Sequence, residues 1–305
     1  MSDSQNNEID IPEPINKPKE KTTAKAEHPK SSKVDVQPKP VLSGNISRGK
    51  SRFEPEAVLV EVPSRGKLYA GSVDDDEVAR GVIRIRPMTL AEEKIITTDR
   101  LIQQGKALDM VLENCVKSNV NSYDLLSSDR LYLLFYLRGM SYGLDYDFAI
   151  RCYHCGFNFE QTIEIDQLPV KTWDEKGDGT EPIVMKLPQT GFEVEARYMR
   201  GHDESKLAEA AREMKNFNQA DDSIGEALTM LITKITTDDG EVLSPKDRMD
   251  FIDHMPAGDA DFFREVLREK DCGIQMLDRI YCPRCNGELE FNVPLGRNFF
   301  RRSRR

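Results

Sequence analysis

The chain has 305 residues, and its 43 Lys and Arg against 53 Asp and Glu give a formal net charge of −10. No run approaches the roughly 18 to 20 consecutive apolar residues that span a bilayer, and the first residues lack the apolar stretch of a secretory signal. We therefore expect a soluble intracellular protein with no membrane partner.

Charge is unevenly distributed along the chain. Residues 1–52 carry ten Lys and Arg against seven Asp and Glu, and residues 297–305 carry five Arg and no acid. The remaining residues, 53–296, hold 28 basic and 46 acidic groups, a net charge of about −18 that repels phosphate backbones. This charge argues against a broad nucleic-acid-binding surface and favours a protein partner.

The first 52 residues differ in composition from the rest. No aromatic residue precedes Phe53, and six of the sixteen prolines fall in this stretch. A segment this polar cannot bury enough surface to offset the entropy of ordering. We expect residues 1–52 to be a disordered tail and residues 297–305 to be a short basic C-terminal tail.

The first half of the remaining chain predicts a turn, a strand, three helices and a β-hairpin. The turn lies in PSRGKLY, residues 63–69, where Leu68 and Tyr69 can dock the preceding extended segment. Thr89 and Glu92 form a capping box at the start of the first helix. The predicted elements are a strand at 82–88, helices at 89–104, 107–117 and 125–139, the last ended by Gly139, and two strands within 142–165 joined at a cysteine pair.

The second half predicts the same order of elements. A strand at 192–200 comes first, and Asp203 is expected to cap the helix that follows it. Ser244 at the cap and Pro245 at the first position begin a later helix. The predicted helices are 204–217, 223–235, 244–255 and the added helix 259–270, and the hairpin is 274–293.

We interpret this recurrence as a degenerate internal duplication, because single residues also correspond. Arg86–Met88 matches Arg197–Met199, and Asp129–Arg130 matches Asp247–Arg248. The alternative is a coincidence between two ordinary α+β stretches. The predicted fold class is α+β, with two degenerate repeats joined through a zinc-ribbon-like site of four cysteines. The boundaries are the tail at 1–52, repeat 1 with its CxxC hairpin at 53–168, a linker at 169–189, repeat 2 with its CxxC hairpin at 190–296 and the basic tail at 297–305.

Four of the six cysteines fall in two CxxC pairs, Cys152 with Cys155 and Cys282 with Cys285. A CxxC turn between strands is typical of a zinc knuckle, and a structural zinc ion takes four ligands, so two knuckles can share one ion. We expect one structural Zn²⁺ per chain, bound by these four cysteines; sites shared between chains are the alternative. Disulfides are rare in a reducing cytoplasm, and a thioredoxin-like pair begins a helix after a strand, which neither pair does.

Residues beside the two pairs have alternative interpretations. Arg151 and Arg284 either offset part of the negative charge of a four-thiolate site or lie as solvated surface charges. His154 is inside its own knuckle, where chelation together with both cysteines would be strained, so it is not assigned as a ligand. Of the lone cysteines, Cys115 is expected in the core and Cys272 at a loop or strand entry.

The sequence predicts that the protein is not an enzyme. Its acidic residues are scattered over helix faces, it has four histidines, and it lacks a nucleophile elbow, a P-loop, a dinucleotide loop and an HExxH motif. Tyr132, Phe135 and Tyr136 fall on one helix, where core packing is favoured over a partner surface. A buried ion pair from Asp129-Arg130 to the other repeat is a further hypothesis.

Three stretches carry a family resemblance: PSRGKLY, IRIRPMTLAEEKIITT and LLSSDRLYLLFYLRGMSYGLDYDFAIRCYHCGFNFEQTIEIDQL. They resemble the T4-type bacteriophage baseplate protein family associated with hub assembly, over most of residues 58–296. The resemblance implies a late viral protein without catalytic residues, which acts in the host cytoplasm and binds baseplate hub proteins while the central hub of the tail forms. It leaves open which hub protein is bound, the oligomeric state, and whether the chain stays in the virion or leaves like a chaperone.

A second hypothesis is a zinc-ribbon regulatory protein that binds nucleic acid through the two knuckles and the terminal RRSRR. DNA affinity that falls steeply with added salt, and that disappears on deletion of Arg301–Arg305, would favour it.

Overall fold

The computed structural model describes residues 52–69, 75–174, 176–216, 223–295 and 299–301. All of the predicted N-terminal tail except Arg52 lies outside the described residues. Residues 52–305 form one unit, so both predicted repeats belong to the same body.

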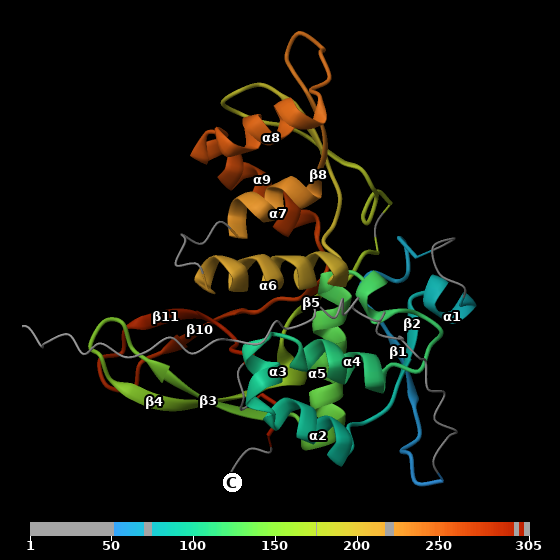
Figure 1. Cartoon of the computed structure of the whole chain (residues 1–305). Coiled ribbons are helices and arrows are strands. Elements are labelled where there is room, and N and C mark those ends of the chain that lie inside the picture. Colours follow the sequence, from blue (N-terminus) through green and yellow to red (C-terminus); the bar gives the residue numbers. More distant parts are fainter. Residues whose placement is uncertain (1–51, 70–74, 175, 217–222, 296–298, 302–305) are drawn as a thin grey trace, which may run out of the picture. The chain divides into compact units, whose positions relative to one another are not determined.

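The first half consists of a small antiparallel sheet, a group of helices and a long hairpin (Figure 1). Its elements are β1 (Val58–Glu61), α1 (Asp76–Ala79), β2 (Val82–Ile85), α2 (Leu90–Thr97), α3 (Asp99–Gln103), α4 (Ala107–Cys115), η1 (Ser122–Asp124), α5 (Ser127–Tyr142), β3 (Asp145–Arg151) and β4 (Asn158–Glu164). The strand β1 pairs with β2, and a bridge between Ile85 and Val116 adds the chain after α4 to the other edge of β2.

Two helix boundaries of the first half differ from the sequence prediction. The helix expected at 89–104 begins at the predicted capping box of Thr89 and Glu92, but it breaks at Thr98, whose extended backbone separates α2 from α3. The helix α5 continues past Gly139 and ends at Gly143, where φ is 93°. Glycine adopts this conformation at little cost, so Gly143 rather than Gly139 ends the helix.

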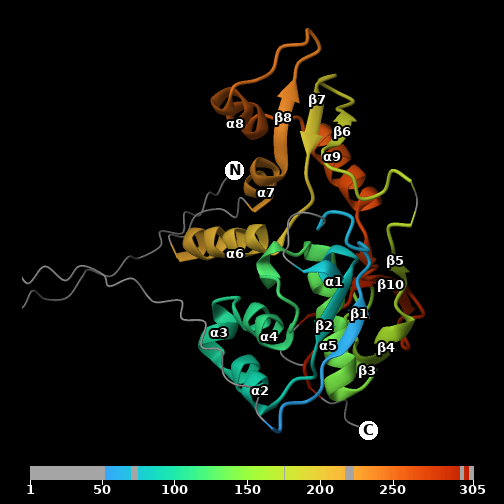
Figure 2. The same ribbon diagram turned by 90° about the vertical axis from the view of Figure 1, so that its right-hand side faces the viewer.

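The second half has a three-stranded sheet in place of the first half's two strands and bridge (Figure 2). Its elements are η2 (Ile165–Gln167), β5 (Val170–Lys171), β6 (Ile183–Lys186), β7 (Glu193–Ala196), α6 (Gly201–Asn216), α7 (Ser223–Leu231), β8 (Ile232–Thr236), α8 (Pro245–Asp253), α9 (Ala257–Lys270), β9 (Gly273–Ile274), β10 (Leu277–Tyr281) and β11 (Glu288–Asn292). The strand β7 is central, with β6 and β8 antiparallel on either side of it.

The segment predicted to be a linker, residues 169–189, is part of the fold. It contributes β5, which pairs with β9, and β6, which is an edge strand of the three-stranded sheet. Trp173 is fully buried, and its indole N–H donates to the Lys270 carbonyl at 2.8 Å. Two glycines, three prolines and four acidic residues are spread over the 21 residues of the segment, and they obscured these short strands in the sequence pattern.

Two further expectations for the second half need correction. The helix predicted at 223–235 ends at Leu231, and the β-branched stretch ITKIT that follows forms β8. Asp203 is not the cap of α6 but its third residue, and its carboxylate accepts from the Arg200 amide at 3.0 Å. Ser244 and Pro245 begin α8 as predicted.

Two aromatic residues near the C-terminus are held in the core. Phe299 and Phe300 are buried, and the Phe299 ring packs edge-on against Phe135 with centroids 4.8 Å apart. The buried Arg138 donates to the Phe299 carbonyl at 3.0 Å. Residues 299–301 are therefore not part of the basic tail that was predicted at 297–305. The prediction counted the arginines and did not consider that Phe299 and Phe300 bury apolar surface.

One hydrophobic core runs through both halves, and polar contacts also join them. The Ser127 amide donates to the Met199 carbonyl at 2.9 Å, and Arg130, which is buried, forms an ion pair with Glu204 at 3.0 Å. The ion pair hypothesised for Asp129-Arg130 is thus made by Arg130. Asp129 instead holds a loop of its own half.

The two halves share a strand order, although a helix, α1, joins the first two strands of the first half and none joins β6 to β7. The strand β2 lies between β1 and the chain at Val116, as β7 lies between β6 and β8. Arg86 donates to the Glu92 carboxylate and to the carbonyl of its own next residue, and Arg197 does the same with Asp203. Each half closes with a CxxC hairpin.

The structure changes one residue correspondence inferred from the sequence. Asp129 and Asp259 are the third residues of α5 and α9, both are fully buried, and each accepts from the loop that joins the first two strands of its half. Each also precedes the first cysteine of its hairpin by 23 residues. Asp129 therefore resembles Asp259 in position, burial and contacts, whereas the sequence comparison paired it with Asp247.

Candidate metal centre

The four CxxC cysteines lie at the ends of two hairpins that run side by side (Figure 1). In the first hairpin β3 pairs with β4 from Asp145 opposite Glu164 to Arg151 opposite Asn158. In the second, β10 pairs with β11 from Leu277 opposite Asn292 to Tyr281 opposite Glu288. In both hairpins the strands end directly before the first cysteine, so each CxxC pair forms the turn.

The two turns have the same backbone geometry. The Cys152 amide donates to the Phe157 carbonyl at 2.8 Å, and the Gly156 amide donates back to Cys152 at 2.8 Å. The Cys282 amide donates to the Gly287 carbonyl at 3.0 Å, and the Asn286 amide donates back to Cys282 at 2.8 Å. The chain therefore reverses twice in the same way.

A left-handed residue follows the second cysteine in each turn. Gly156 has φ 71° and Asn286 has φ 54°. The sequence analysis placed glycines after both pairs, but in the second turn Asn286 takes the left-handed position, which asparagine tolerates better than most residues. Gly287 is needed for a different reason, because a Cβ there would lie 2.6 Å from Cδ2 of His154 in the first turn.

The four sulfur atoms form one cluster. The Sγ atoms of Cys152 and Cys285 are 3.7 Å apart, as are those of Cys155 and Cys282, and all four lie within 4.8 Å of one another. All are free thiols. Sulfur ligands at about 2.3 Å from a tetrahedral Zn²⁺ are separated by about 3.8 Å, so the cluster has the size of an all-thiolate zinc site.

The pairing across the cluster is reciprocal. The first cysteine of each turn faces the second cysteine of the other, and the first cysteines, Cys152 and Cys282, are buried while Cys155 and Cys285 are exposed. The same reciprocity holds for the intervening residues: His154 lies against Gly287, and Arg284 lies over the Phe157 ring at 5.8 Å. Contacts between two parts that are related by a two-fold axis have this reciprocal form.

Electrostatics within the cluster favour a bound cation. Burial opposes ionisation of Cys282, but the amides of Cys285 and Arg284 and the neighbouring thiols donate to its sulfur, so its pKa is lowered to about 6. The Gly287 amide favours the Cys285 thiolate, yet burial and the three neighbouring thiols raise the pKa of Cys285 to about 12. Four crowded thiols thus release one proton easily and retain another, because neighbouring thiolates repel each other. A divalent cation would offset the repulsion between the thiolates.

The residues beside the thiols connect the two hairpins. The Nε2 atom of His154 lies 2.9 Å from the Glu288 carbonyl, and the Tyr153 hydroxyl donates to the same carbonyl at 3.0 Å. His154 thus contacts the opposite hairpin and lies outside the sulfur cluster. Arg284 stacks on an aromatic ring, whereas Arg151 is exposed beside its own turn.

A small apolar core supports the cluster from below. Cys152, Cys282 and Leu289 are each about fully buried, and Ile150, Phe159 and Ile280 pack against them. These residues come from all four hairpin strands, so the strands position the buried thiols.

The lone cysteines lie in the positions expected of them. Cys115 ends α4 with no exposed surface, and burial raises its pKa to about 12. Cys272 directly precedes β9 and is buried, with its sulfur 3.4 Å from the Ser128 hydroxyl. Burial also raises the pKa of Cys272.

The sequence analysis did not recognise the buried carboxylates that hold loops. Asp129 accepts from the Ser64 amide at 3.0 Å, from the Ser64 hydroxyl and from the Tyr69 hydroxyl at 2.7 Å. These contacts fix the PSRGKLY turn, and Tyr69 is buried as expected for a docking residue. Burial raises the pKa of Asp129 to about 6 against the effect of these hydrogen bonds. The equal spacing to the cysteines is the signal that could have revealed Asp129 and Asp259 together.

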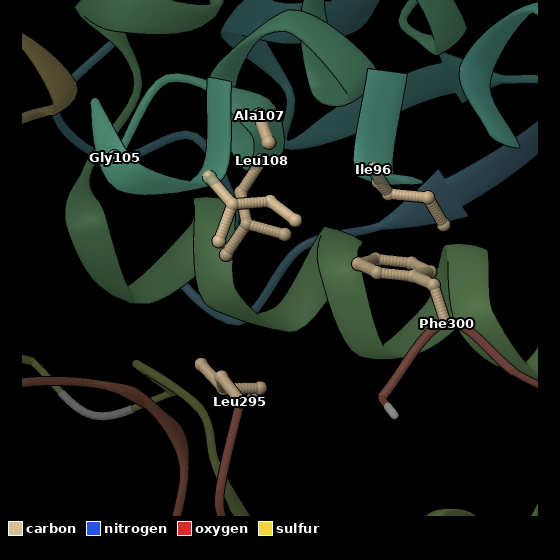
Figure 3. Close-up of a pocket in the computed structure, with 7 residues that line it drawn as sticks. Ile96, Gly105, Ala107, Leu108, Leu295 and Phe300 are labelled. Atoms are coloured by element: carbon tan, nitrogen blue, oxygen red, sulfur yellow. The ribbon is translucent and has the colours of Figure 1, made fainter. Parts of the chain in front are cut away.

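A pocket of about 300 Å³ lies between the helices α2 to α4 and the end of the chain (Figure 3). It is lined by apolar residues and a glycine: Ile96, Ile102, Gly105, Ala107, Leu108, Leu295 and Phe300. This pocket offers a bound molecule neither an acid, a base nor a nucleophile.

Comparison with known proteins identifies the family. The family model described as T4 bacteriophage base plate protein matches residues 55–300. The chain belongs to this family. The match covers both cysteine hairpins and the whole of the three-stranded sheet, so the cysteine cluster is part of the base plate domain of this chain.

Other comparisons add nothing to the family assignment. No curated protein and no solved structure matches the chain. Within the described residues, no helix combines the length and apolar character that crossing a bilayer requires.

Proposed function

We propose that this base plate family member is a non-catalytic protein of baseplate hub formation, which binds hub proteins and acts as an assembly factor or as a structural component. The family match over residues 55–300 carries the proposal. The net charge of about −18 over residues 53–296 supports a protein partner, since it disfavours nucleic acid. The site of action is the host cell during tail assembly, and a structural component would remain in the virion.

The metal part of the proposal assigns one Zn²⁺ per chain to Cys152, Cys155, Cys282 and Cys285. The sulfur separations of 3.7 Å, the four free thiols and the amides aimed at sulfur support this ion. A zinc ion bound by four thiolates has no open position for a substrate, so its role here is structural. It would hold the first half to the second, because each hairpin supplies two ligands.

The fold part of the proposal is an internal duplication. Three observations support it. The two halves share a strand order, and Arg86 and Arg197 each bind a carboxylate of the helix that follows. Asp129 and Asp259 each precede the first cysteine of their hairpin by 23 residues. A chain that arose in this way would have begun as two identical subunits sharing one metal ion. The reciprocal cysteine contacts have the form that such a pair would leave.

The test of the hub proposal is deletion of the gene from the phage, followed by complementation. We expect free hub components to accumulate and intact tails to be lost, with recovery when the full chain is supplied from a plasmid. Mass spectrometry of purified virions then separates an assembly factor, which is absent from particles, from a structural component. Wild-type yields of infectious particles after deletion would reject an essential role in hub formation.

A further inference from the structure

A second hollow, distinct from the one in Figure 3, lies beside α5. It has a volume of about 430 Å³, and residues from α5, the start of the first hairpin, η2, β5 and β9 line it. Its lining is apolar or aromatic apart from one acid: Tyr132, Phe135, Tyr136, Gly139, Met140, Leu144, Ile165, Asp166, Leu168, Val170 and Ile274. We call this hollow the α5 groove.

The α5 groove is open to solvent although it is apolar. Tyr136, Leu144 and Val170 are 37%, 46% and 42% exposed. Exposed apolar side chains are ordinary when they are scattered, but a contiguous group in a hollow marks an interaction site. The expectation that Tyr132, Phe135 and Tyr136 serve core packing holds for Phe135, which is buried against Phe299, whereas Tyr136 borders the groove.

The second half of the chain supplies an internal control. Because Asp259 corresponds to Asp129, residues of α9 correspond to those of α5 with a constant shift of 130. At this shift Phe135, Gly139 and Met140 of the groove are matched by the exposed Glu265, Glu269 and Lys270, whereas Tyr132 and Tyr136 are matched by Phe262 and Val266. Three of the five α5 positions in the groove are therefore polar on α9, so the helix itself does not require a nonpolar residue at those three positions.

The lining of the α5 groove has one charged residue, Asp166, which forms its acidic border. Burial, the neighbouring Tyr136, and the carboxylates of Glu61 and Asp129 raise the pKa of Tyr132. The groove thus combines apolar anchoring positions with an acidic border, on a body whose net charge is about −18.

We propose that the α5 groove is the docking site for an amphipathic segment of a partner protein, whose apolar side chains enter the groove and whose flanking Lys and Arg side chains face its acidic border. The volume accommodates two or three apolar side chains, the usual number of anchors when a peptide lies in a groove. This inference rests on the proposed function, in which the partner is a hub protein.

The experiment measures the affinity of the purified full chain for each hub protein of the same phage by titration calorimetry. Leu144→Lys and Asp166→Lys should each weaken binding of the hub protein at least about tenfold, the first by placing a charge in the groove and the second by reversing its border. Ile224→Lys and Asp238→Lys are matched controls on other exposed positions, and they should leave the affinity within about twofold.

The outcomes separate this inference from the proposed function. If the wild-type chain binds no hub protein, both fail. If it binds one and the two groove variants bind equally well, the function stands and the groove is not the site. Thermal unfolding of each variant confirms that its fold is retained, and the exposure of Leu144 and Asp166 makes folding of both variants expected.

Two other occupants of the groove would also overturn the proposal. A wild-type dimer that Leu144→Lys converts to a monomer would show that a second copy of the chain fills the groove. A chain lacking residues 1–51 that binds the hub protein at least about tenfold more tightly would show that its own N-terminal segment does so. Light scattering and the same calorimetric titration distinguish these cases.

Discussion

The two buried aspartates hold corresponding loops in the two halves with different chemistry. In the first half, Asp129 accepts from one backbone amide, that of Ser64 at 3.0 Å, and from two hydroxyls, those of Ser64 and Tyr69. In the second half, Asp259 accepts from the backbone amides of Gln189 at 2.7 Å and Thr190 at 3.0 Å, and from one hydroxyl.

The difference shows which hydrogen bonds between an aspartate and its loop can change. A hydroxyl can rotate its proton toward another acceptor, whereas an amide N–H is fixed by the backbone. The hydroxyls bound to Asp129 can therefore adapt to a changed side chain, whereas the contacts of Asp259 need two acceptor oxygens at fixed places. The cysteine hairpins differ less, because both turns place two thiols in one cluster of four sulfur atoms.

The largest effect is expected where the two halves share the sulfur cluster. Cys152→Ser removes one of four ligands, so zinc content should fall well below one ion per chain. The free energy of unfolding should fall by about 3 kcal/mol or more, since structural zinc contributes about 10 kcal/mol or more in small zinc-binding peptides. Elemental analysis and urea unfolding measure the two quantities.

Cys115→Ser is the matched control for the cluster. Cys115 is equally buried but lies in the core outside the sulfur cluster, so its substitution should leave the zinc content unchanged. Zinc content that is the same in Cys152→Ser as in Cys115→Ser would contradict the assignment of the ion.

The next largest effect tests the difference between the two aspartates directly. Asp259→Asn turns one acceptor oxygen into a donor that faces a fixed amide, so we expect a loss of about 2 to 3 kcal/mol in the free energy of unfolding. Asp129→Asn keeps an oxygen for the Ser64 amide, and the two hydroxyls can turn, so the loss should be smaller by at least about 1 kcal/mol. Urea unfolding of both variants at pH 7 tests the order, and equal losses would refute the explanation.

The sequence predicted elements whose signals are local. The capping box of Thr89 and Glu92, the start of α8 at Ser244 and the CxxC hairpins all follow from short patterns and are present. The meeting of the four thiols was inferred from valence alone, because four ligands needed a common ion, and the clustering of the sulfur atoms confirms that meeting.

The remaining features depend on contacts between distant residues. The strands β5 and β6 are short and pair with partners that the local pattern does not reveal. Phe299 is buried through contacts with residues far away in the sequence, among them Phe135, Arg138 and Tyr146. The correspondence of Asp129 with Asp259 was missed because Asp247-Arg248 offered a closer dipeptide match, whereas the hydrogen bonds that decide it reach across about 65 to 70 residues.

The pH dependence of the Asp129 hydrogen bonds gives a sharper test. Burial raises the pKa of Asp129 from 3.8 to about 6, so the folded state binds a proton that the unfolded state has released between these values. Its contribution to stability is therefore full below pH 4 and is lost as the pH rises through 6. Wild type should gain up to about 3 kcal/mol over Asp129→Asn between pH 7 and pH 4.

The comparison with Asp129→Asn is needed because the thiols also titrate. Protonation of the cysteine cluster lowers the stability of both proteins at low pH, and the difference between them cancels that contribution. Urea unfolding at several pH values measures the difference, and a difference that is constant with pH would show that folding does not raise the pKa of Asp129.

The smallest effect concerns the residue after the second cysteine of each turn. Gly156 and Asn286 share a left-handed backbone, and a Cβ at Gly156 would meet only the Arg151 guanidinium, at 4.0 Å. Space is therefore available, and the cost of a side chain there is conformational. Gly156→Ala should lower the free energy of unfolding by about 1 kcal/mol, and Gly156→Asn by about half as much, because asparagine tolerates this conformation in the other turn. Both variants should keep the zinc content of wild type. A larger loss for Asn than for Ala would mean that the two turns differ in more than their sequences, and the structural equivalence of the knuckles would have to be abandoned.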